Sequence, residues 1–488
     1  MDRVADFESE GCAFESRRAH QGNHKVRKQY GIAARRLLGG LGTCVALALV
    51  LVLTTGWAVG EAAPSAAGGG AKAPQAGWPE FRGPWGNGLV APAGDAVPRG
   101  LPVRWSETEN VKWKVEIPHR GWSTPVVLGN QVWLTTATLE GNDFFAICVD
   151  ADTGKIVFNE KVFHADNPEP LGNNVNGYAS PSPVIEPGRV YVHFGSYGTA
   201  CLDTATSKPL WQRRDLPCRH YRGPGSSPIL LEGLLILTFD GVDVDYLVAL
   251  DKKTGKTVWK TDRSTRWDDL DAQGKPTREG DFRKAFSTPL VIDVGGKPQL
   301  ISAGSKALFS YDPRTGRELW TVRHTAHTAV LRPVFSRGLV VFCTGLGKPE
   351  LWAVRPDGQG DVTGTHVAWK LEKGAPKTPS PIAVDDLLYI VSDEGVGMCL
   401  EAATGKEVWK ERIGGNFAAS PVYADGRLYF FNQQGKATVL KAGRTYEAPT
   451  TNTLESGCMA SPAVAGKALF VRTKTHLYRI EAGHSGRE

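Results

Sequence analysis

Histidine, basic, amide and aromatic residues recur in the long connections between the expected β-strands of this 488-residue chain. Cationic and aromatic side chains held close together can bind an acidic or sugar-like ligand, or an extended peptide. We take these as candidate ligand-binding residues: His119, Arg120, Trp122, Asn176, Tyr178, His220, Arg222, Arg283, His324, Arg332, Lys377 and Asn416. The same connections hold Asn174, Tyr221, Lys284, Phe286, His327 and Phe417. The alternative is that all of them are solvated loop residues.

Motifs that would indicate catalysis are missing from the sequence. It contains no G-x-S-x-G, no H-E-x-x-H and no phosphate-binding P-loop, and no cysteine or histidine spacing typical of a metal site. We therefore predict no catalytic, cofactor-binding or metal-ligating residue.

A repeated motif shows which elements must position the candidate residues. The stretch DKKTGKTVW ends at Trp259, and related stretches end at Phe158, Trp211, Trp320 and Trp409, with degenerate copies ending at Trp369 and Tyr446. Seven copies cannot all serve one ligand site, so the motif indicates a repeat architecture.

A second repeated signature starts a strand in each unit. A Ser/Thr-Pro-apolar step places prolines at Pro125, Pro183, Pro228, Pro289, Pro381, Pro421 and Pro462, with Arg332-Pro333-Val334 as a variant. The first unit shows three strand-like runs before its turn and a fourth after it. Four strands in a unit of this length are typical of a β-propeller blade.

The two ends of the repeat array are incomplete in complementary ways. The last unit, Ser461 to Glu481, has only three strands, while Asn110 to Glu116 is an unassigned strand before the first unit. Pairing the two would close the ring and remove an open sheet edge. We predict an all-β, eight-bladed propeller over residues 111–483, closed by this N-terminal strand.

The repeated turn has a structural interpretation. Its Asp and Thr can hydrogen-bond backbone groups, and its Gly supplies a positive φ. The aromatic residue then lies across the seam to the next blade, which predicts blade-docking roles for Trp113, Phe158, Trp211, Trp259, Trp320, Trp369 and Trp409. Cys148, Cys201 and Cys399 share one repeat position with Ala249 and Ser310, so we expect small packing residues there rather than disulfides.

The N-terminal region has a different composition. Residues 1–36 form a basic leader, and residues 37–60 are uncharged and apolar enough for a signal peptide or a membrane anchor. Residues 61–77 are expected as a flexible linker and 78–110 as an arm. Basic residues before the apolar segment place everything downstream outside the cytoplasm. We expect an exported protein of the periplasm or cell envelope, in contact with the membrane only through residues 37–60.

Beyond residue 60 the chain holds 49 Lys or Arg against 46 Asp or Glu. This near-neutral balance gives no reason to expect nucleic acid as a partner.

The repeat resembles the pyrroloquinoline-quinone (PQQ) repeat, A-x-D-x-x-T-G-x-x-x-W, and Trp78 to Gly88, WPEFRGPWGNG, is similar to the lead-in of exported PQQ-like propellers. That family includes quinoprotein alcohol dehydrogenases and the propeller lipoprotein of the outer-membrane barrel-assembly machine. The resemblance implies the fold and leaves two functions open. The first is a monomeric binding or scaffold protein for an envelope protein or peptide, without catalysis. The alternative is a PQQ-dependent alcohol or sugar dehydrogenase with Ca²⁺, although the adjacent cysteines of such enzymes are missing here.

Overall fold

The computed structural model describes residues 77–92, 97–172, 175–278 and 280–485. The chain divides into two compact units, Met1–Pro64 and Ser65–Glu488, and the described residues all belong to the second. The expected leader, the apolar segment 37–60, most of the linker and Asn174 lie outside them. The described ranges contain β-strands but no α-helix, and hence no helix long and apolar enough to cross a membrane.

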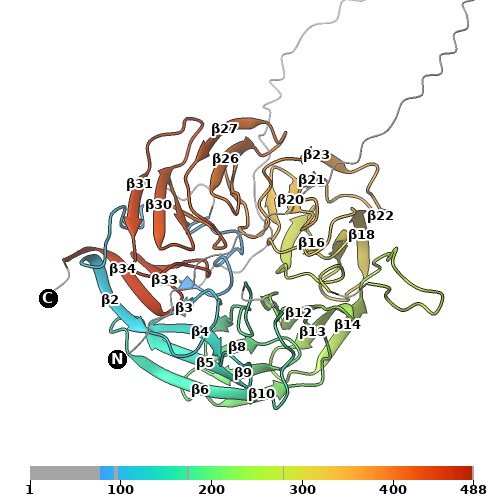
Figure 1. Ribbon diagram of the computed structural model, residues 1–488, viewed down its shortest axis with the longest axis horizontal. Coiled ribbons are helices and arrows are strands. Elements are labelled where there is room, and N and C mark those ends of the chain that lie inside the picture. The colour runs from blue at the N-terminus through green and yellow to red at the C-terminus, as the bar shows by residue number, and fades with distance from the viewer. Residues whose placement is uncertain (1–76, 93–96, 173–174, 279, 486–488) are drawn as a thin grey trace, which may run out of the picture. The chain divides into compact units, whose positions relative to one another are not determined.

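Eight sheets form the blades of a propeller, as predicted (Figure 1). Blade 1 contains β3 (Val126–Leu128), β4 (Gln131–Ala137), β5 (Asp143–Asp150) and β6 (Ile156–His164), and β1 (Gly77–Trp78) extends its inner edge. Blade 2 contains β7 (Val184–Glu186), β8 (Arg189–His193), β9 (Thr199–Asp203) and β10 (Pro209–Arg213). Blade 3 contains β11 (Ile229–Leu231), β12 (Leu234–Asp240), β13 (Asp245–Asp251) and β14 (Thr257–Asp262). Blade 4 contains β15 (Leu290–Val294), β16 (Lys297–Ala303), β17 (Ala307–Tyr311) and β18 (Glu318–Arg323), with β22 (Gly360–Asp361) added in parallel.

The remaining blades follow the same order from the inner to the outer strand. Blade 5 contains β19 (Val334–Ser336), β20 (Leu339–Cys343), β21 (Leu351–Val354) and β23 (Val367–Leu371). Blade 6 contains β24 (Ile382–Val384), β25 (Leu387–Val391), β26 (Val396–Glu401) and β27 (Glu407–Arg412). Blade 7 contains β28 (Val422–Ala424), β29 (Arg427–Phe431), β30 (Lys436–Lys441) and β31 (Thr450–Thr453). Blade 8 contains β32 (Ala463–Ala465), β33 (Ala468–Arg472), β34 (His476–Ser485) and, as its outer strand, β2 (Glu109–Glu116).

The predicted closure of the ring is confirmed. The antiparallel pair of β2 and β34 joins the two ends of the propeller in one sheet, and Figure 1 shows the cyan β2 beside the red β34. Strand direction alternates within each blade, which gives the ring two distinct faces. The "turn face" carries the hairpins after the inner strands and the Thr-Gly turns. The "loop face" carries the connections from one blade to the next and those between the second and third strands.

The Ser/Thr-Pro signature is explained by hydrogen bonds between neighbouring blades. In six of the blades the hydroxyl oxygen of this Ser or Thr accepts the backbone N–H of the equivalent residue in the preceding blade. The bonds, all 2.9–3.0 Å long, run from Thr124 to Ser182, Ser182 to Ser227, Ser227 to Thr288, Arg332 to Ser380, Ser380 to Ser420 and Ser420 to Ser461. We call this series the hydroxyl ring. Arg332 has no hydroxyl, so the series is interrupted at blade 5.

The Thr-Gly turn is held as its sequence suggests. The Asp251 carboxylate accepts the backbone N–H and the hydroxyl of Thr254, both at 2.8 Å. In five blades, a backbone carbonyl of this repeated turn accepts the indole N–H of a Trp on the outer strand of the preceding blade. The pairs, 2.9–3.1 Å apart, are Trp113 to Ala151, Trp211 to Lys252, Trp259 to Pro313, Trp369 to Ala402 and Trp409 to Gly443.

Two aromatic residues of the series make other contacts. Trp320 donates to Gln299 Oε1 of its own blade at 2.9 Å, and it is fully buried with residues of blade 5. Phe158 has no donor and stacks on Trp133 with ring centroids 5.9 Å apart. Small residues lie opposite these rings on the neighbouring strand. Cys148, Cys201 and Cys399 pair in register with Phe158, Trp211 and Trp409, and all six described cysteines are buried and free of disulfides.

The degenerate copy ending at Tyr446 was misplaced. The outer strand of blade 7 begins at Thr450, and Tyr446 lies in the preceding turn with its ring packed on Trp409 at 5.3 Å. Trp105 occupies the seam between blades 7 and 8 and stacks on Tyr429 and Phe431 at 6.4 and 5.9 Å. This aromatic residue comes from the segment before β2, where the repeat pattern does not extend.

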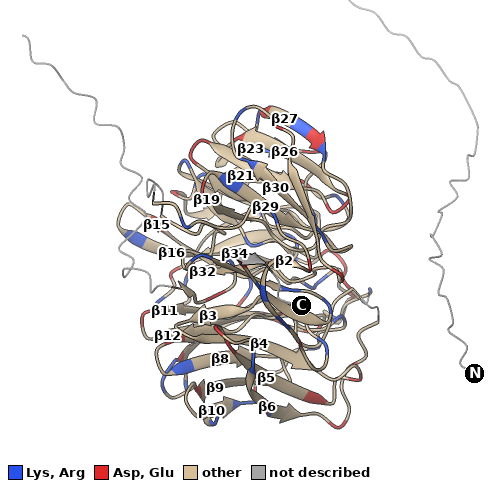
Figure 2. Cartoon of the chain, turned by 90° about the vertical axis from the view of Figure 1, so that its left-hand side faces the viewer, with Lys and Arg blue, Asp and Glu red and all other residues tan. Residues whose placement is uncertain are grey.

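Hydrophobic clusters lie between neighbouring blades, so the core is distributed around the ring. One cluster joins Phe144 and Ala146 of blade 1 to Val190 and Val192 of blade 2. Basic and acidic residues are interspersed over the blades in the side view (Figure 2).

Candidate functional site

The N-terminal arm lies on the inner strands from the turn face. After β1 pairs with β3, the Pro79 carbonyl accepts the N–H of Ile185 in blade 2 at 2.9 Å. Gly88 accepts the N–H of Tyr423 in blade 7 at 3.0 Å, and Val90 donates to the Tyr423 carbonyl at 3.1 Å. Because the arm covers inner strands on this side, the loop face is the side on which a ligand site is open.

Arg332 anchors this arm and does not face the loop-face connections. Its Nη1 lies 2.9 Å from Glu80 Oε1 and donates to the Phe81 carbonyl at 2.5 Å, and its Nε donates to the Pro289 carbonyl at 3.1 Å. The arginine that interrupts the hydroxyl ring is therefore the residue that fastens the arm to blade 5.

One cavity of about 670 Å³ opens on the loop face where the connections of blades 7, 8, 1 and 2 meet. We call it the loop-face groove. It is lined by His119, Arg120, Trp122, Leu139, Val175, Gln433, Met459 and Lys474. The first three belong to the predicted ligand-binding set, and the structure brings them together.

Backbone hydrogen bonds and ring stacking fix the walls of the groove. Arg120 and Ala137 exchange two backbone hydrogen bonds of 3.0 and 2.8 Å. The His119 ring stacks on Phe145 with centroids 4.1 Å apart, and the Arg120 guanidinium lies 4.9 Å from the Trp122 ring centroid. The histidine, the arginine and the indole are thus presented from one short segment with defined geometry.

The groove combines exposed apolar surface with positive charge. Leu139 and Val175 are 66% and 69% exposed, which is unusual for such side chains on a folded ring. Arg120 and Lys474 are the basic residues at its wall besides His119, and none of the eight lining residues is Asp or Glu. The Trp122 indole N–H is buried and has no acceptor among the described residues. The groove can therefore receive an apolar group beside a carboxylate or carbonyl oxygen.

Three further basic candidates are neutralised by carboxylates. Arg222 Nε lies 2.7 Å from Asp281, Arg283 Nη2 lies 2.5 Å from Asp269, and Lys377 Nζ lies 2.7 Å from Glu394. The Arg222 and Lys377 pairs join two loop-face connections, the Arg283 pair lies within one, and all three occupy the cations with carboxylates of the chain.

Four of the other candidates are held within the fold, whereas Asn416 is exposed and is bonded there through its backbone. His220 is buried, and burial together with the neighbouring Lys284 lowers its pKa well below the usual value. Burial lowers the pKa of His324 to about 4. Asn176 Nδ2 donates to the Arg222 and Pro224 carbonyls at 2.9 and 3.0 Å, the Tyr178 hydroxyl donates to the Glu169 carbonyl at 2.9 Å, and Asn416 N–H donates to Gln434 Oε1 at 2.9 Å. The structure therefore does not bring the twelve predicted residues into one funnel.

Five groove residues were not among the sequence candidates. Leu139, Gln433 and Lys474 lie in connections between second and third strands, and Val175 and Met459 lie in connections between blades. The repeat phase could have indicated the first group, because those connections return to the same face as the blade-to-blade ones.

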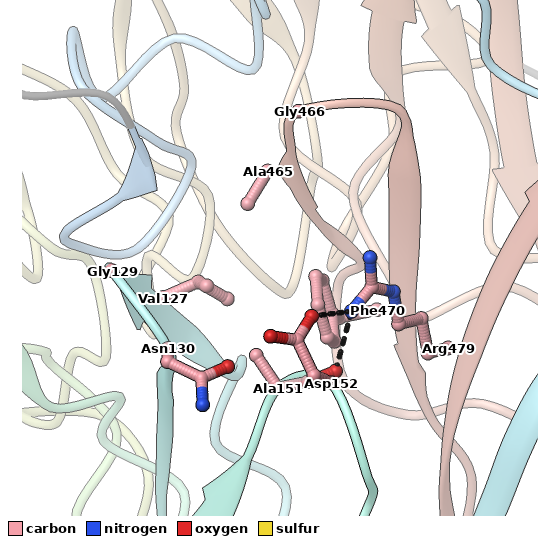
Figure 3. Close-up of a pocket in the computed structure, with 9 residues that line it drawn as sticks. All are labelled: Val127, Gly129, Asn130, Ala151, Asp152, Ala465, Gly466, Phe470 and Arg479. Atoms are coloured by element: carbon pink, nitrogen blue, oxygen red, sulfur yellow. Dashed lines mark hydrogen bonds and ion pairs between the residues drawn. The ribbon is translucent and has the colours of Figure 1, made fainter.

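A smaller cavity of about 340 Å³ lies on the turn face at the seam of blades 8 and 1 (Figure 3). Arg479 points into the seam, where its Nη1 donates to the Ala151 carbonyl and to Asp152 Oδ1, both at 2.7 Å. Asn130 lies across the cavity on the hairpin of blade 1. Arg479 is the one arginine that lines this cavity, and its contacts join blade 8 to blade 1. We therefore assign these residues to closure of the ring rather than to a ligand.

The described residues do not fit a site for PQQ with Ca²⁺. No group of three or more His, Cys, Asp or Glu side chains in the described ranges could hold a metal ion. Carboxylate oxygens of Asp and Glu are preferred ligands of Ca²⁺. The described cysteines are not adjacent in sequence and are all free.

Comparisons with known proteins agree with this architecture. A curated relative, tetrathionate hydrolase of Acidithiobacillus ferrooxidans, is 24% identical over 353 residues, which cover 57% of this chain and 65% of the relative, less than two thirds of its length. The structure of BamB from Moraxella catarrhalis matches with a TM-score of 0.51 and 12% identity, covering 78% of this chain and 99% of that one. A europium-containing methanol dehydrogenase matches with a TM-score of 0.60 and 11% identity, covering 81% and 89%. At these identities the two structures show a shared fold only. The family model described as outer membrane protein assembly factor BamB matches residues 103–285 and 243–487, and this chain belongs to that family.

Proposed function

We propose that this protein is a recognition propeller of the cell envelope that binds an extended segment of a partner protein in the loop-face groove. The observation that carries the proposal is the composition of the groove, which joins exposed Leu139 and Val175 to the cations of Arg120 and Lys474 without a carboxylate.

This composition favours a particular occupant. An apolar side chain of the segment would cover Leu139 and Val175, and acidic residues beside it would face Arg120 and Lys474. The Trp122 indole N–H would donate to a backbone carbonyl of the segment, because it has no acceptor among the described residues. We therefore propose that the occupant of the groove is an extended peptide with one large apolar residue between acidic residues.

Two further observations support a role in the envelope. The family description names an assembly factor of the outer membrane, and residues 37–60 have the composition of an export signal or anchor after a basic leader. Side chains carried on connections of a rigid ring suit recognition, since the blades hold them in place.

The test is peptide binding to the full chain by fluorescence anisotropy. We expect an acidic-apolar-acidic peptide to bind, and a peptide of equal length with lysine in place of each acidic residue to bind at least about tenfold more weakly. Lys474→Glu should weaken the acidic peptide, whereas the control Lys253→Glu, an exposed Thr-Gly turn residue on the opposite face, should not. Equal binding of both peptides, or equal loss in both variants, would remove the groove from consideration.

Two activity assays on the same preparation separate enzyme alternatives. Dye reduction with PQQ, Ca²⁺ and an alcohol or sugar would favour the dehydrogenase. Hydrolysis of tetrathionate would instead assign to this chain the activity named for the curated relative.

A further inference from the structure

Three arginines are almost fully buried in the propeller. Arg82 of the arm is 1% exposed, and Arg332 before β19 and Arg472 at the end of β33 are each 2% exposed. Buried cations in proteins are normally paired, because removing a charge from water without a partner is strongly unfavourable.

Only one of the three has a carboxylate partner within the described ranges. Arg332 Nη1 lies 2.9 Å from Glu80 Oε1. Arg472 Nη1 donates to neutral oxygens alone, namely the Ser123 carbonyl, the Ser123 hydroxyl and the Thr135 carbonyl, at 3.1, 2.6 and 3.1 Å. Among the described residues, Arg82 and Arg472 therefore have no carboxylate as a counter-charge.

Arg82 has the least satisfied guanidinium. Its Nη2 donates to the Asn87 carbonyl at 2.7 Å, while Nε and Nη1 are buried and have no acceptor in the part of the chain that the structure describes. Its backbone has a φ of 66°, a conformation uncommon for a non-glycine residue. The arm holds this side chain inside the ring although its own hydrogen bonds do not satisfy it, which points to a missing acceptor.

Glycines of the arm make room for the two guanidiniums. A Cβ on Gly88 would lie 2.7 Å from Arg82 Nη2, and a Cβ on Gly86 would lie 2.4 Å from Arg332 Cζ. The GPWGNG stretch of the arm is therefore shaped to admit two cations at close quarters, and no acidic residue lies within it.

The electrostatics agree with a shortage of negative charge. Burial and the neighbouring Arg332 cation lower the pKa of Arg82 to about 9. Burial also lowers the pKa of Arg472 to about 9. Burial raises the pKa of Glu80, against the opposing effect of Arg332, so this carboxylate is itself less readily ionised.

We infer that the inside of the ring binds a monovalent inorganic anion of the size of chloride, which accepts hydrogen bonds from Nε and Nη1 of Arg82 beside Arg332. The anion supplies the acceptor and the negative charge that the described residues lack, and it fastens the arm to the ring. This site is distinct from the loop-face groove and does not depend on the proposed function.

The first test is crystallography of the full chain in bromide. Bromide replaces chloride and is located by its anomalous scattering. The inference expects an anomalous peak within hydrogen-bond distance of Arg82. A map without a peak there, or with a peak at Arg472 alone, overturns it.

The second test follows thermal unfolding while gluconate is exchanged for chloride at constant ionic strength. We expect the midpoint to rise with chloride and to saturate, and Arg82→Gln to weaken the apparent chloride affinity by about tenfold or more, the usual effect of losing a charged donor. The control Arg444→Gln removes an exposed arginine paired with Asp386 and Glu401 and should keep the wild-type chloride dependence. Chloride dependence that survives in Arg82→Gln contradicts the inference. If Arg82→Gln does not fold, the bromide map of the wild type decides alone.

Discussion

The indole ring of Trp211 lies directly on Gly255, so that a Cβ on this glycine would be 2.7 Å from Trp211 Cδ2. The φ of Gly255 is 71°, which also favours glycine. The same contact recurs for Trp113 on Gly154, Trp259 on Gly316 and Trp369 on Gly405. The glycine of the repeated turn is thus required twice, for its backbone conformation and for the aromatic residue of the preceding blade.

These two requirements can be separated by three alanine variants. Gly255→Ala violates both requirements. Gly426 has a φ of 73° but open space where a Cβ would lie, so Gly426→Ala violates only the first. Gly364 has neither a positive φ nor a close neighbour, so Gly364→Ala violates neither. We expect Gly426→Ala to lose about 1 kcal/mol of unfolding free energy, Gly255→Ala clearly more, and Gly364→Ala to change little. Urea unfolding of the full chain measures all three. Equal losses for Gly255→Ala and Gly426→Ala would show that the ring contact adds nothing.

Removing a docking indole should destabilise the ring without affecting recognition. Trp259 is 8% exposed and donates to the Pro313 carbonyl of blade 4 at 3.1 Å. We expect Trp259→Ala to lower the free energy of unfolding by about 3–5 kcal/mol, as truncation of a buried aromatic does. Affinity for the groove peptide should stay at the wild-type level in the folded fraction, because blade 3 does not line the groove. A large loss of affinity would tie this seam to the site.

The fold could be predicted from the sequence because its repeats encode contacts between neighbouring units. The Ser/Thr-Pro signature and the Thr-Gly turn each recur with the blade, and the unpaired strand around Trp113 indicated how the ring closes. Trp105 could not be placed in this way, because it fills the seam of blades 7 and 8 from a segment outside the repeat. A residue that acts once leaves no periodic signal.

The hydroxyl ring predicts a cost for removing a single hydroxyl. Ser227 is 3% exposed, and its Oγ accepts the buried N–H of Ser182 at 2.9 Å. Ser227→Ala leaves that N–H without an acceptor and should cost about 1–3 kcal/mol. Ser264→Ala, at an exposed hydroxyl bonded to Glu318, should change the unfolding free energy by no more than about 0.5 kcal/mol. Comparable values for the two variants would mean that the ring of hydroxyls does not stabilise the blades.

The Thr-Gly turns should contribute to the acid sensitivity of the fold. Hydrogen bonds from the Thr hydroxyl, and then from backbone N–H groups, lower the pKa of Asp150, Asp203 and Asp251 below the ordinary value of an aspartate. Because these folded-state pKa values are depressed, their stabilisation is complete above the unfolded value and is lost as the pH falls through the folded values. If all three are replaced with Asn, the free energy of unfolding should fall less steeply between about pH 5 and pH 2 than in the wild type. Urea unfolding at a series of pH values measures this slope. A slope equal to that of the wild type would assign the acid sensitivity to other groups.

The candidate site was harder to predict than the fold because burial and ion pairing are decided by tertiary contacts. Arg222 and Arg283 were expected to face a ligand, but Asp281 pairs with Arg222 and Asp269 pairs with Arg283. Both carboxylates lie in the same connection as Arg283. Arg332 was expected among the ligand-binding residues, but it pairs with Glu80, which lies about 250 residues earlier in the chain. His119, Arg120 and Trp122 line one groove because they come from one short segment, and their role in binding stays a prediction.

The two kinds of surface in the loop-face groove predict different responses to salt. Lys474 would attract the peptide's carboxylates through its charge. Lys474→Ala should therefore weaken binding strongly at low ionic strength and little at high ionic strength, where salt limits the interaction between charges to a few ångströms. Leu139 would act by apolar burial, so Leu139→Ala should weaken binding by a factor that salt leaves almost unchanged. Anisotropy titrations of both variants at about 20 mM and 500 mM NaCl measure this difference. Parallel salt dependences in the two variants would contradict a peptide seated with its apolar residue on Leu139 and its acidic residue at Lys474.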